Sequence, residues 1–407
     1  MELNYQRLNE LSEIYGNAYY ILDSQQFKKN FIELKEEFTK FYSNFNIAYS
    51  YKTNYIPKLC KIVNELNGYA EVVSDMELEI ALRIGVDPQK IIWNGPYKDQ
   101  EKIEELLLKG GIVNLDSLYE KSIIEKISKK YPNKILHIGI RCNFDIEDGV
   151  ISRFGFDVNG KEFEEIIKSM RSLPNIKLIS LQCHFATRAI EYWKNKVKGM
   201  LQLLDKLNFI PEILDLGGGL FGKMEESLKK QFNSKIPSYS EYALEIAKVV
   251  ADYFEGKDKK PQLLIEPGSA LVGDCMKFVT KVINIKTVRE KNIATVLGSI
   301  YNINPTLNTK NPPLNIYTQI KEKRNEYCNL DFGGFTCIES DYLYKGYKGE
   351  LAIGDIVVFG NVGSYSVVLK PPFILPNFPI IDIINNQEIE VIKQQENFDD
   401  IFHTYKF

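Results

Sequence analysis

The sequence predicts an α/β protein in which a (β/α)8 barrel precedes an all-β domain. Three observations predict this fold. Eight short apolar segments occur along the first two thirds of the chain, and the stretches between them carry apolar residues at helical spacing, as expected for parallel strands joined by helices. After Pro267, short β-branched and aromatic segments separated by turn residues replace this alternation. The eight expected barrel strands are residues 45–49, 70–73, 90–93, 112–115, 135–140, 177–182, 212–216 and 262–265.

Helices are expected between these strands. In residues 57–66, for example, Leu59, Ile62, Val63 and Leu66 fall on one helical face. The N-cap candidates are Ser74 or Asp75, Asp116 or Ser117, and Ser240. An open doubly wound sheet would give a similar alternation and is the alternative to the barrel. The other expected helices are residues 76–84, 100–108, 117–129, 162–171, 188–207 and 240–254.

The all-β domain is expected to be discontinuous. The strand-like segment 19–22 precedes the barrel and can return to the β domain. We therefore expect the barrel to occupy residues 24–260 and the β domain to occupy residues 1–23 and 261–407. Its expected strands are residues 277–288, 293–297, 314–317, 356–359, 367–370 and 389–392.

Composition excludes several classes of partner. Lys and Arg number 51 against 54 Asp and Glu, so no overall positive charge is available for nucleic acid or anionic membrane. No apolar run is long enough to span a bilayer, and the first residues lack the features of a signal peptide, so a cytoplasmic location is expected. Six scattered cysteines without a C-x-x-C pair predict free thiols and no metal site.

The residues that follow the expected strands are the candidate functional residues, because a barrel carries its chemistry at the C-terminal ends of its strands. Lys52 follows the first strand, where partial desolvation would make its amine nucleophilic. Arg141 ends the fifth strand. His184 follows the sixth, where a flat imidazole can lie against an aromatic ligand.

An anion cradle and a carboxylate follow the last two strands. Gly217, Gly218 and Gly219 expose backbone N–H groups to an anion such as a phosphate. Glu266 can hold a proton on a heterocyclic nitrogen. An amine, a flat support, a phosphate cradle and a carboxylate around one opening together suit pyridoxal 5′-phosphate (PLP), the predicted cofactor.

The sequence resembles the fold-type III PLP-dependent decarboxylases, the group of diaminopimelate, ornithine and arginine decarboxylases, with alanine racemase as a more distant relative. The resemblance extends from about residue 16 to residue 365. It rests on motifs at residues 48–54, 71–78, 152–156, 183–187, 216–219, 266–268, 337–341 and 363–365.

This resemblance implies roles in cofactor binding. It implies that Lys52 binds PLP covalently, that His184 stacks on the ring, and that Thr187, the three glycines and Tyr365 contact the phosphate region. Gly268 belongs to the motif that also carries Glu266, and Arg141 is a candidate contact by its position.

The resemblance also implies a homodimer with shared active sites and a small amino acid as substrate. In the family, the motif that matches residues 337–341 reaches into the partner's active site. Cys337 is then the expected proton donor to the α-carbon after CO2 leaves, and Asp341 is expected to orient the Cys337 loop or the substrate amine.

Departures from the family motifs predict a specialised substrate. Ser269 stands where diaminopimelate decarboxylases have an arginine, and residues 301–305 contain no second arginine, so a distal carboxylate would be bound poorly. Ile338 stands where related enzymes have an acid for a distal ammonium. Ala186 and Thr187 replace a glycine and a serine. We expect decarboxylation of a non-standard amino acid or biosynthetic intermediate.

Two alternatives share this barrel. The first is a PLP-dependent amino acid racemase. Glu266 argues against it, because alanine racemase places an arginine at the pyridine nitrogen. The second is a non-catalytic PLP-binding protein, against which Cys337 and Asp341 argue, since a cofactor carrier needs no proton donor.

Overall fold

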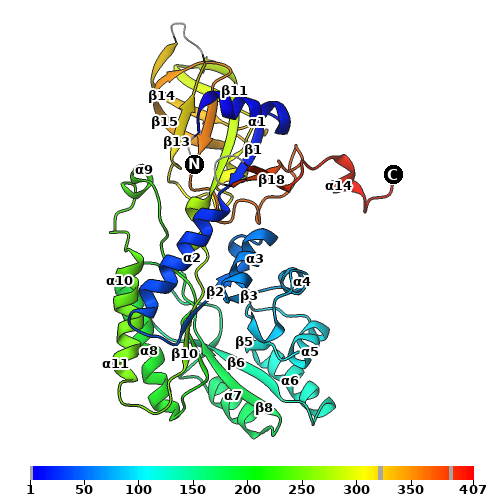
Figure 1. Cartoon of the computed structure of the whole chain (residues 1–407), viewed down its shortest axis with the longest axis vertical. Coiled ribbons are helices and arrows are strands. Elements are labelled where there is room, and N and C mark those ends of the chain that lie inside the picture. Colours follow the sequence, from blue (N-terminus) through cyan, green and yellow to red (C-terminus); the bar gives the residue numbers. More distant parts are fainter. Residues whose placement is uncertain (1–2, 320–323, 385–387) are drawn as a thin grey trace. The chain divides into compact units, whose positions relative to one another are not determined.

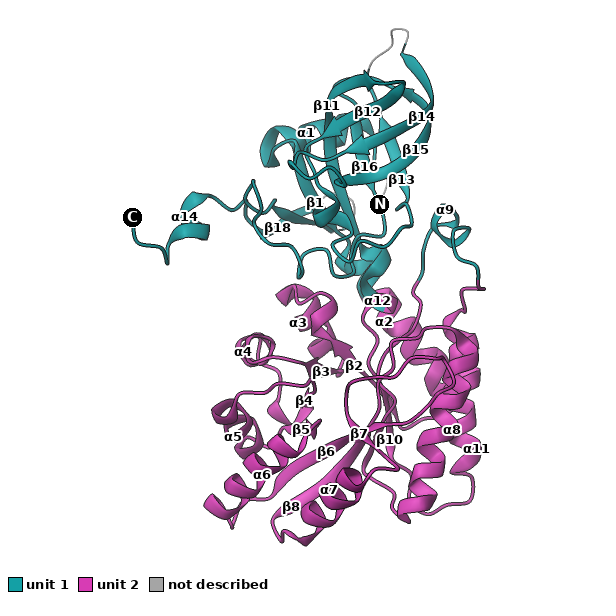
Figure 2. Cartoon of the chain, turned by 180° about the vertical axis from the view of Figure 1, so that it is seen from behind, with its two compact units in different colours: residues 1–27, 223–233, 271–407 teal, residues 28–222, 234–270 magenta. Residues whose placement is uncertain are grey.

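A computed structural model describes residues 3–319, 324–384 and 388–407. The chain forms two compact units, coloured separately in Figure 2. The first, here called the barrel unit, comprises residues 28–222 and 234–270. The second, the β unit, comprises residues 1–27, 223–233 and 271–407.

The barrel unit contains a closed ring of eight parallel strands. Each strand pairs in parallel with its neighbours in the order β2-β3-β4-β5-β6-β8-β9-β10, and the β10–β2 pairing closes the ring. The predicted barrel is confirmed. The ring consists of β2 (Phe45–Ser50), β3 (Tyr69–Val72), β4 (Ile91–Trp93), β5 (Ile112–Leu115), β6 (Leu136–Asn143), β8 (Ile176–Gln182), β9 (Ile213–Asp215) and β10 (Gln262–Ile265), and β7 (Phe156–Asp157) pairs beside β6.

Apolar burial explains why these segments form the ring. All six residues of β2 are buried, as expected for a strand covered on both faces. Side chains from six different strands pack into one cluster. The ring is therefore a packed core whose functional edge lies at the strand ends. The cluster consists of Ala48, Ile92, Ile112, Ile179, Ile213 and Leu264.

Amphipathic helices surround the ring, as Figure 1 shows. Ser74 and Ser117 cap α4 and α6 as predicted, whereas Ser238 caps α10 in place of the predicted Ser240. Ser238 fits because Glu241 lies three residues later and completes a capping box. The helices are α3 (Pro57–Glu65), α4 (Asp75–Arg83), α5 (Gln100–Leu108), α6 (Leu118–Lys130), α7 (Lys161–Ser172), α8 (Ile190–Leu207), α10 (Tyr239–Ala243) and α11 (Val249–Tyr253), with short turns η1 (Tyr51–Thr53), η2 (Pro88–Lys90) and the π-helical η3 (Leu244–Lys248).

The β unit is built on one long strand, β11 (Met276–Val288), which pairs antiparallel with β1, β12 and β16. The N-terminal strand β1 (Ala18–Leu22) lies between β11 and β17, so the first residues of the chain belong to this unit. The other strands are β12 (Lys291–Val296), β13 (Leu314–Tyr317), β14 (Asn325–Gly333), β15 (Tyr342–Leu351), β16 (Ile356–Phe359), β17 (Ile380–Ile384) and β18 (Glu388–Lys393).

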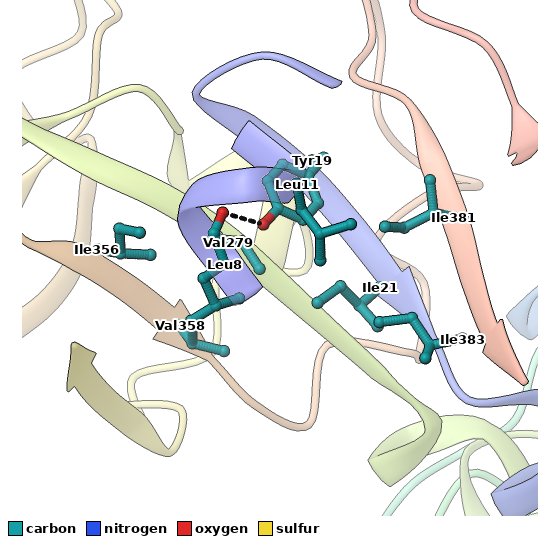
Figure 3. Close-up of a cluster of buried hydrophobic side chains, with 9 residues drawn as sticks. All are labelled: Leu8, Leu11, Tyr19, Ile21, Val279, Ile356, Val358, Ile381 and Ile383. Atoms are coloured by element: carbon teal, nitrogen blue, oxygen red, sulfur yellow. Dashed lines mark hydrogen bonds between the residues drawn. The ribbon is translucent and has the colours of Figure 1, made fainter. Parts of the chain in front are cut away.

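A buried apolar cluster joins α1 (Tyr5–Tyr15) to this sheet (Figure 3). Leu8 and Leu11 lie one helical turn apart and pack against strand side chains, and the Tyr19 hydroxyl donates a hydrogen bond of 3.1 Å to the Leu8 carbonyl.

The remaining helices are mostly short. They are α9 (Glu226–Lys229), α12 (Ser269–Val272), η4 (Gly273–Cys275), α13 (Ile300–Ile303) and α14 (Phe398–Phe402). The longer α2 (Ser24–Thr39) has residues in both units.

Two further expectations differ from the structure. Residues 261–270 group with the barrel unit, because β10 completes the ring, and residues 24–27 and 223–233 group with the β unit, whereas the barrel was expected to occupy residues 24–260. The predicted strand 367–370 is wrong: the Leu369 N–H bonds to the Tyr365 carbonyl four residues earlier, which makes a turn. Pro371 and Pro372 follow and cannot donate to a strand neighbour.

Over the ranges that the structure describes, no helix is long and apolar enough to cross a membrane.

Candidate active site

Lys52 stands at the C-terminal edge of the ring, in η1 directly after β2. Its Nζ atom lies 2.6 Å from Oε2 of Glu71, a buried residue of β3, and 2.7 Å from Oγ of Ser50. The lysine side chain remains 29% exposed, so an incoming ligand can reach its amine. A carboxylate beside a reachable amine can both hold the ammonium in place and accept its proton.

Glu266 follows β10 and is buried on the same edge. Its Oε1 atom accepts hydrogen bonds from Asn94 Nδ2 at 2.6 Å and from Gln182 Nε2 at 3.1 Å. Burial alone would raise the pKa of Glu266, but the adjacent His184 and the charge of Lys52 outweigh burial and lower this pKa to about 2. Glu266 is therefore a fixed negative charge at neutral pH.

His184 follows β8 and joins Glu266 to the glycine loop. Its Nδ1 atom accepts the Gly218 N–H at 2.9 Å and lies 3.5 Å from Oε2 of Glu266. Burial lowers the pKa of His184, and the charges of Lys52 and Lys196 act in the same direction, whereas the hydrogen bond with Glu266 raises it. The imidazole is held between Glu266 and the glycine loop, which suits a ring that supports a flat ligand.

The loop Gly217–Gly219 follows β9 and admits only glycine at its two ends. Gly217 has φ +63° and Gly219 has φ +95°, in the left-handed region. A Cβ atom at Gly217 would lie 2.2 Å from the Cys183 carbonyl oxygen, and one at Gly219 would lie 2.8 Å from that of Phe185. The backbone of this loop is therefore held close to its neighbours, as an anion cradle requires.

Three further predicted residues of the barrel unit have protein partners. Arg141 forms an ion pair with Asp116 at 3.2 Å and lies over the Phe154 ring. The Thr187 hydroxyl donates a hydrogen bond to Asp148, so a phosphate contact would require it to change its acceptor. Gly268 packs so closely against Thr53 that a Cβ atom would lie 2.0 Å from Thr53 Oγ1. The roles of all three in cofactor binding stay predictions.

The remaining predicted residues belong to the β unit. Cys337 is exposed in the loop between β14 and β15. The Asp341 carboxylate is buried and accepts hydrogen bonds from the Ile300 N–H at 2.7 Å and from the Thr336 hydroxyl at 2.6 Å. These contacts favour the loop-orienting role for Asp341 over a contact with substrate. Tyr365 has φ +63°, an uncommon conformation for a non-glycine residue.

A buried hydrogen-bond chain that the sequence did not predict crosses the barrel. Asn94 Nδ2 donates to Glu71 at 3.1 Å as well as to Glu266, and Asn94 Oδ1 accepts from Asn114 Nδ2 at 2.7 Å. Asn94 thus connects the partner of Lys52 to the partner of His184. Its position directly after β4 was the available signal, because every strand end points to the same edge.

Glu77 of α4 lies beside this site, and its buried carboxyl should make the free energy of unfolding depend on pH. Burial raises its pKa to about 7, although the Val73 N–H bonds to its carboxylate. Because the folded pKa is raised, the stabilisation is complete below about pH 4.5 and is lost as the pH rises through 7. Relative to Glu77→Gln, which mimics the protonated acid, the wild type should lose about 3 kcal/mol between pH 4.5 and 8.

Urea unfolding of both proteins at pH 4.5 and pH 8 measures this difference. Glu79→Gln, an exposed change on the same helix, is the control and should show no such trend. If the free energies of unfolding of the wild type and Glu77→Gln differ by the same amount at both pH values, the raised pKa of Glu77 is contradicted.

The fold and these residues together define a class of protein. An amine (Lys52), an imidazole, an ionised buried carboxylate and a glycine cradle that side chains would fill meet at one edge of a parallel β/α barrel. This donor set fits the amine-reactive aldehyde, the ring, the ring nitrogen and the phosphate of PLP. The molecule is a PLP-binding barrel enzyme.

Comparison with known proteins places it within that class. The family model described as "Pyridoxal-dependent decarboxylase, pyridoxal binding domain" matches residues 24–273, and the chain belongs to this family. The predicted family, its PLP cofactor and a decarboxylase as the type of enzyme are therefore confirmed.

Individual relatives cover almost the whole chain. Diaminopimelate decarboxylase of Aquifex aeolicus is 24% identical, over 96% of this chain and 92% of that protein. The L-glutamyl-[BtrI acyl-carrier protein] decarboxylase of Niallia circulans is 26% identical, over 99% and 97%. The crystal structure of diaminopimelate decarboxylase from M. jannaschii superposes with a TM-score of 0.87 at 21% identity, covering 98% of this chain and 94% of that one, which shows the shared fold.

Proposed function

We propose that this decarboxylase acts on an amino acid whose side chain ends in an uncharged group, and not on plain diaminopimelate. The observation that carries the proposal is Ser269, which stands where a carboxylate-binding arginine is expected. Residues 301–305 supply no replacement guanidinium, and Ile338 supplies no acid for a distal ammonium. A substrate with a charged end would lose its desolvated charge partner.

The named substrate of one relative agrees with this proposal. In an L-glutamyl-carrier-protein substrate, the α-carboxyl must be free to leave as CO2, so the bond to the carrier uses the other carboxyl. That bond removes the distal negative charge. An amino acid masked in this way at its side-chain carboxyl is the substrate class that we propose.

The roles of the barrel residues follow from their contacts. Bound through Lys52, PLP supplies the electron sink that makes loss of the α-carboxyl possible. Glu71 accepts a proton from the Lys52 ammonium when the amine reacts, since the two atoms are 2.6 Å apart. Glu266 holds a proton on the ring nitrogen, and Asn94 and Gln182 fix the Glu266 carboxylate in place.

The last step of the proposed reaction transfers a proton to the substrate α-carbon. We assign it to the thiol of Cys337, donated across a homodimer to the substrate α-carbon of the other chain. Asp341 supports this role through its bonds to Thr336 and Ile300, which anchor the loop that carries Cys337.

A substrate panel tests the proposed specificity. Purified enzyme with added PLP is given diaminopimelate, lysine, glutamate, the γ-methyl ester of glutamate and a glutamyl-carrier protein, and CO2 release is measured. We expect kcat/KM for the masked glutamates to exceed that for diaminopimelate by at least about 10²-fold. The Lys52→Ala variant measures the background. Diaminopimelate as the best substrate would contradict the proposal.

A further inference from the structure

Two side chains of α8 hold the glycine loop from behind. Lys196 Nζ donates a hydrogen bond of 2.9 Å to the Gly218 carbonyl, and Trp193 Nε1 donates one of 2.8 Å to the Gly219 carbonyl. Lys196 and Trp193 are three residues apart and so lie on one face of α8, which is one of the helices around the ring (Figure 1). The carbonyls of two consecutive peptides are therefore fixed toward this helix.

Peptide geometry turns this contact into an orientation of the loop. In a trans peptide the C=O and the next residue's N–H point in opposite directions, and the described chain contains no cis peptide. With the Gly218 and Gly219 carbonyls directed at α8, the N–H groups of Gly219 and Leu220 point away from it. Within the described residues, neither N–H has a hydrogen-bond acceptor.

A third contact fixes the far end of the loop. The Tyr242 hydroxyl accepts the Phe221 N–H at 3.1 Å and donates to the Arg188 carbonyl at 2.6 Å. The two unpaired N–H groups thus lie between residues whose own bonds are satisfied. They are the donors that this loop can offer to an anion.

Lys196 also carries a buried charge that is not held in an ion pair. Its side chain is 2% exposed, packs over the Trp193 ring at 3.7 Å, and forms no ion pair within the described part of the chain. Burial lowers its pKa to about 8, although Cys183, Glu266 and Asp215 oppose that change. An ammonium buried in this way is costly unless an anion accompanies it.

Lys196 also differs from the other cation considered for this site. Arg141 is already paired with Asp116, whereas Lys196 is bonded directly to the cradle through the Gly218 carbonyl.

We propose that Lys196 and Trp193 are positioning residues for the phosphate of PLP. Through the Gly218 and Gly219 carbonyls they aim the Gly219 and Leu220 N–H groups at the phosphate, and the Lys196 ammonium balances its charge from behind the loop. The proposal rests on the PLP-dependent function above and assigns to α8 a part of cofactor recognition.

Cofactor affinity with and without the phosphate tests this inference. Dissociation constants of PLP and of pyridoxal are measured from the visible absorbance of the apoprotein titrated with each. Lys196→Met should raise the dissociation constant of PLP by at least about tenfold and change that of pyridoxal less than about twofold. Trp193→Phe, which keeps an aromatic ring but loses the pyrrole part of the indole with its N–H, should raise the dissociation constant of PLP about threefold. Inorganic phosphate should compete with PLP for the wild type and not for Lys196→Met.

Lys194→Met removes a lysine from the exposed side of the same helix and is the matched control, expected to bind both ligands like the wild type. Equal weakening of PLP and pyridoxal, or no weakening of either, would overturn the inference and leave the decarboxylase function standing. A wild type that binds neither ligand would overturn both. If Lys196→Met fails to fold by circular dichroism, Trp193→Phe gives the answer by the same comparison.

Discussion

Replacing Lys52 by alanine is expected to lower kcat by at least about 10³-fold, which corresponds to more than about 4 kcal/mol of lost transition-state stabilisation. Lys52 is the amine at the barrel edge that lies between Ser50 and Glu71, and the proposed chemistry has no second nucleophile there. The visible absorbance of bound PLP should change with the loss of the covalent bond. Lys61→Ala, an exposed lysine on the next helix, should keep full activity.

The same variant tests the shared active site. When Lys52→Ala is mixed with Cys337→Ala under conditions that exchange subunits, half of the dimers become mixed dimers, and each of these holds one intact site out of two. Activity should then return to roughly a quarter of the wild-type value. A mixture as inactive as its components would contradict a site completed by Cys337 of the partner subunit.

Replacing Glu266 by glutamine is expected to lower kcat by about 10²–10³-fold while PLP still binds. The amide keeps the shape of the side chain but cannot hold a proton on the ring nitrogen. In the wild type this carboxylate is ionised at neutral pH and held by Asn94 and Gln182. The loss should therefore appear in kcat, with a small effect on KM.

Glu212→Gln is the matched control for that experiment. Glu212 precedes β9 at the opposite end of the ring, is exposed, and pairs with Lys177 on the surface. Its replacement should leave kcat unchanged. A Glu266→Gln enzyme with wild-type kcat would remove the electrostatic role of this residue from the mechanism.

The barrel could be predicted from the sequence because its strands are buried on both faces. Each of the eight apolar segments coincides with a strand of the ring to within a few residues. The C-terminal edge then follows from the parallel direction of the strands, and Lys52, His184 and Glu266 do meet there.

The supporting residues could not be predicted because their types carry little signal. Asn94 and Gln182 resemble ordinary polar residues at strand ends, and only the structure connects both of them to Glu266. Lys196 lies in a helix with an ordinary amphipathic pattern. The sequence therefore gives no sign of its hydrogen bond to the Gly218 carbonyl.

Three strands of the β unit were not predicted, and polarity accounts for two of them. Strands β14 and β15 are rich in charged and tyrosine residues with half-exposed faces, whereas the third, β17, is apolar and buried. Residues 367–370 have a typical strand composition, yet the left-handed Tyr365 and the following prolines direct them into a turn.

The central claim is that Lys52 binds PLP covalently, and borohydride reduction followed by peptide mass mapping tests it most directly. The account predicts that the visible absorbance of the PLP-treated protein bleaches on reduction and that a pyridoxyl group is found on the peptide containing Lys52. A protein that stays colourless with added PLP, or an adduct on another lysine with Lys52 unmodified, would contradict the account.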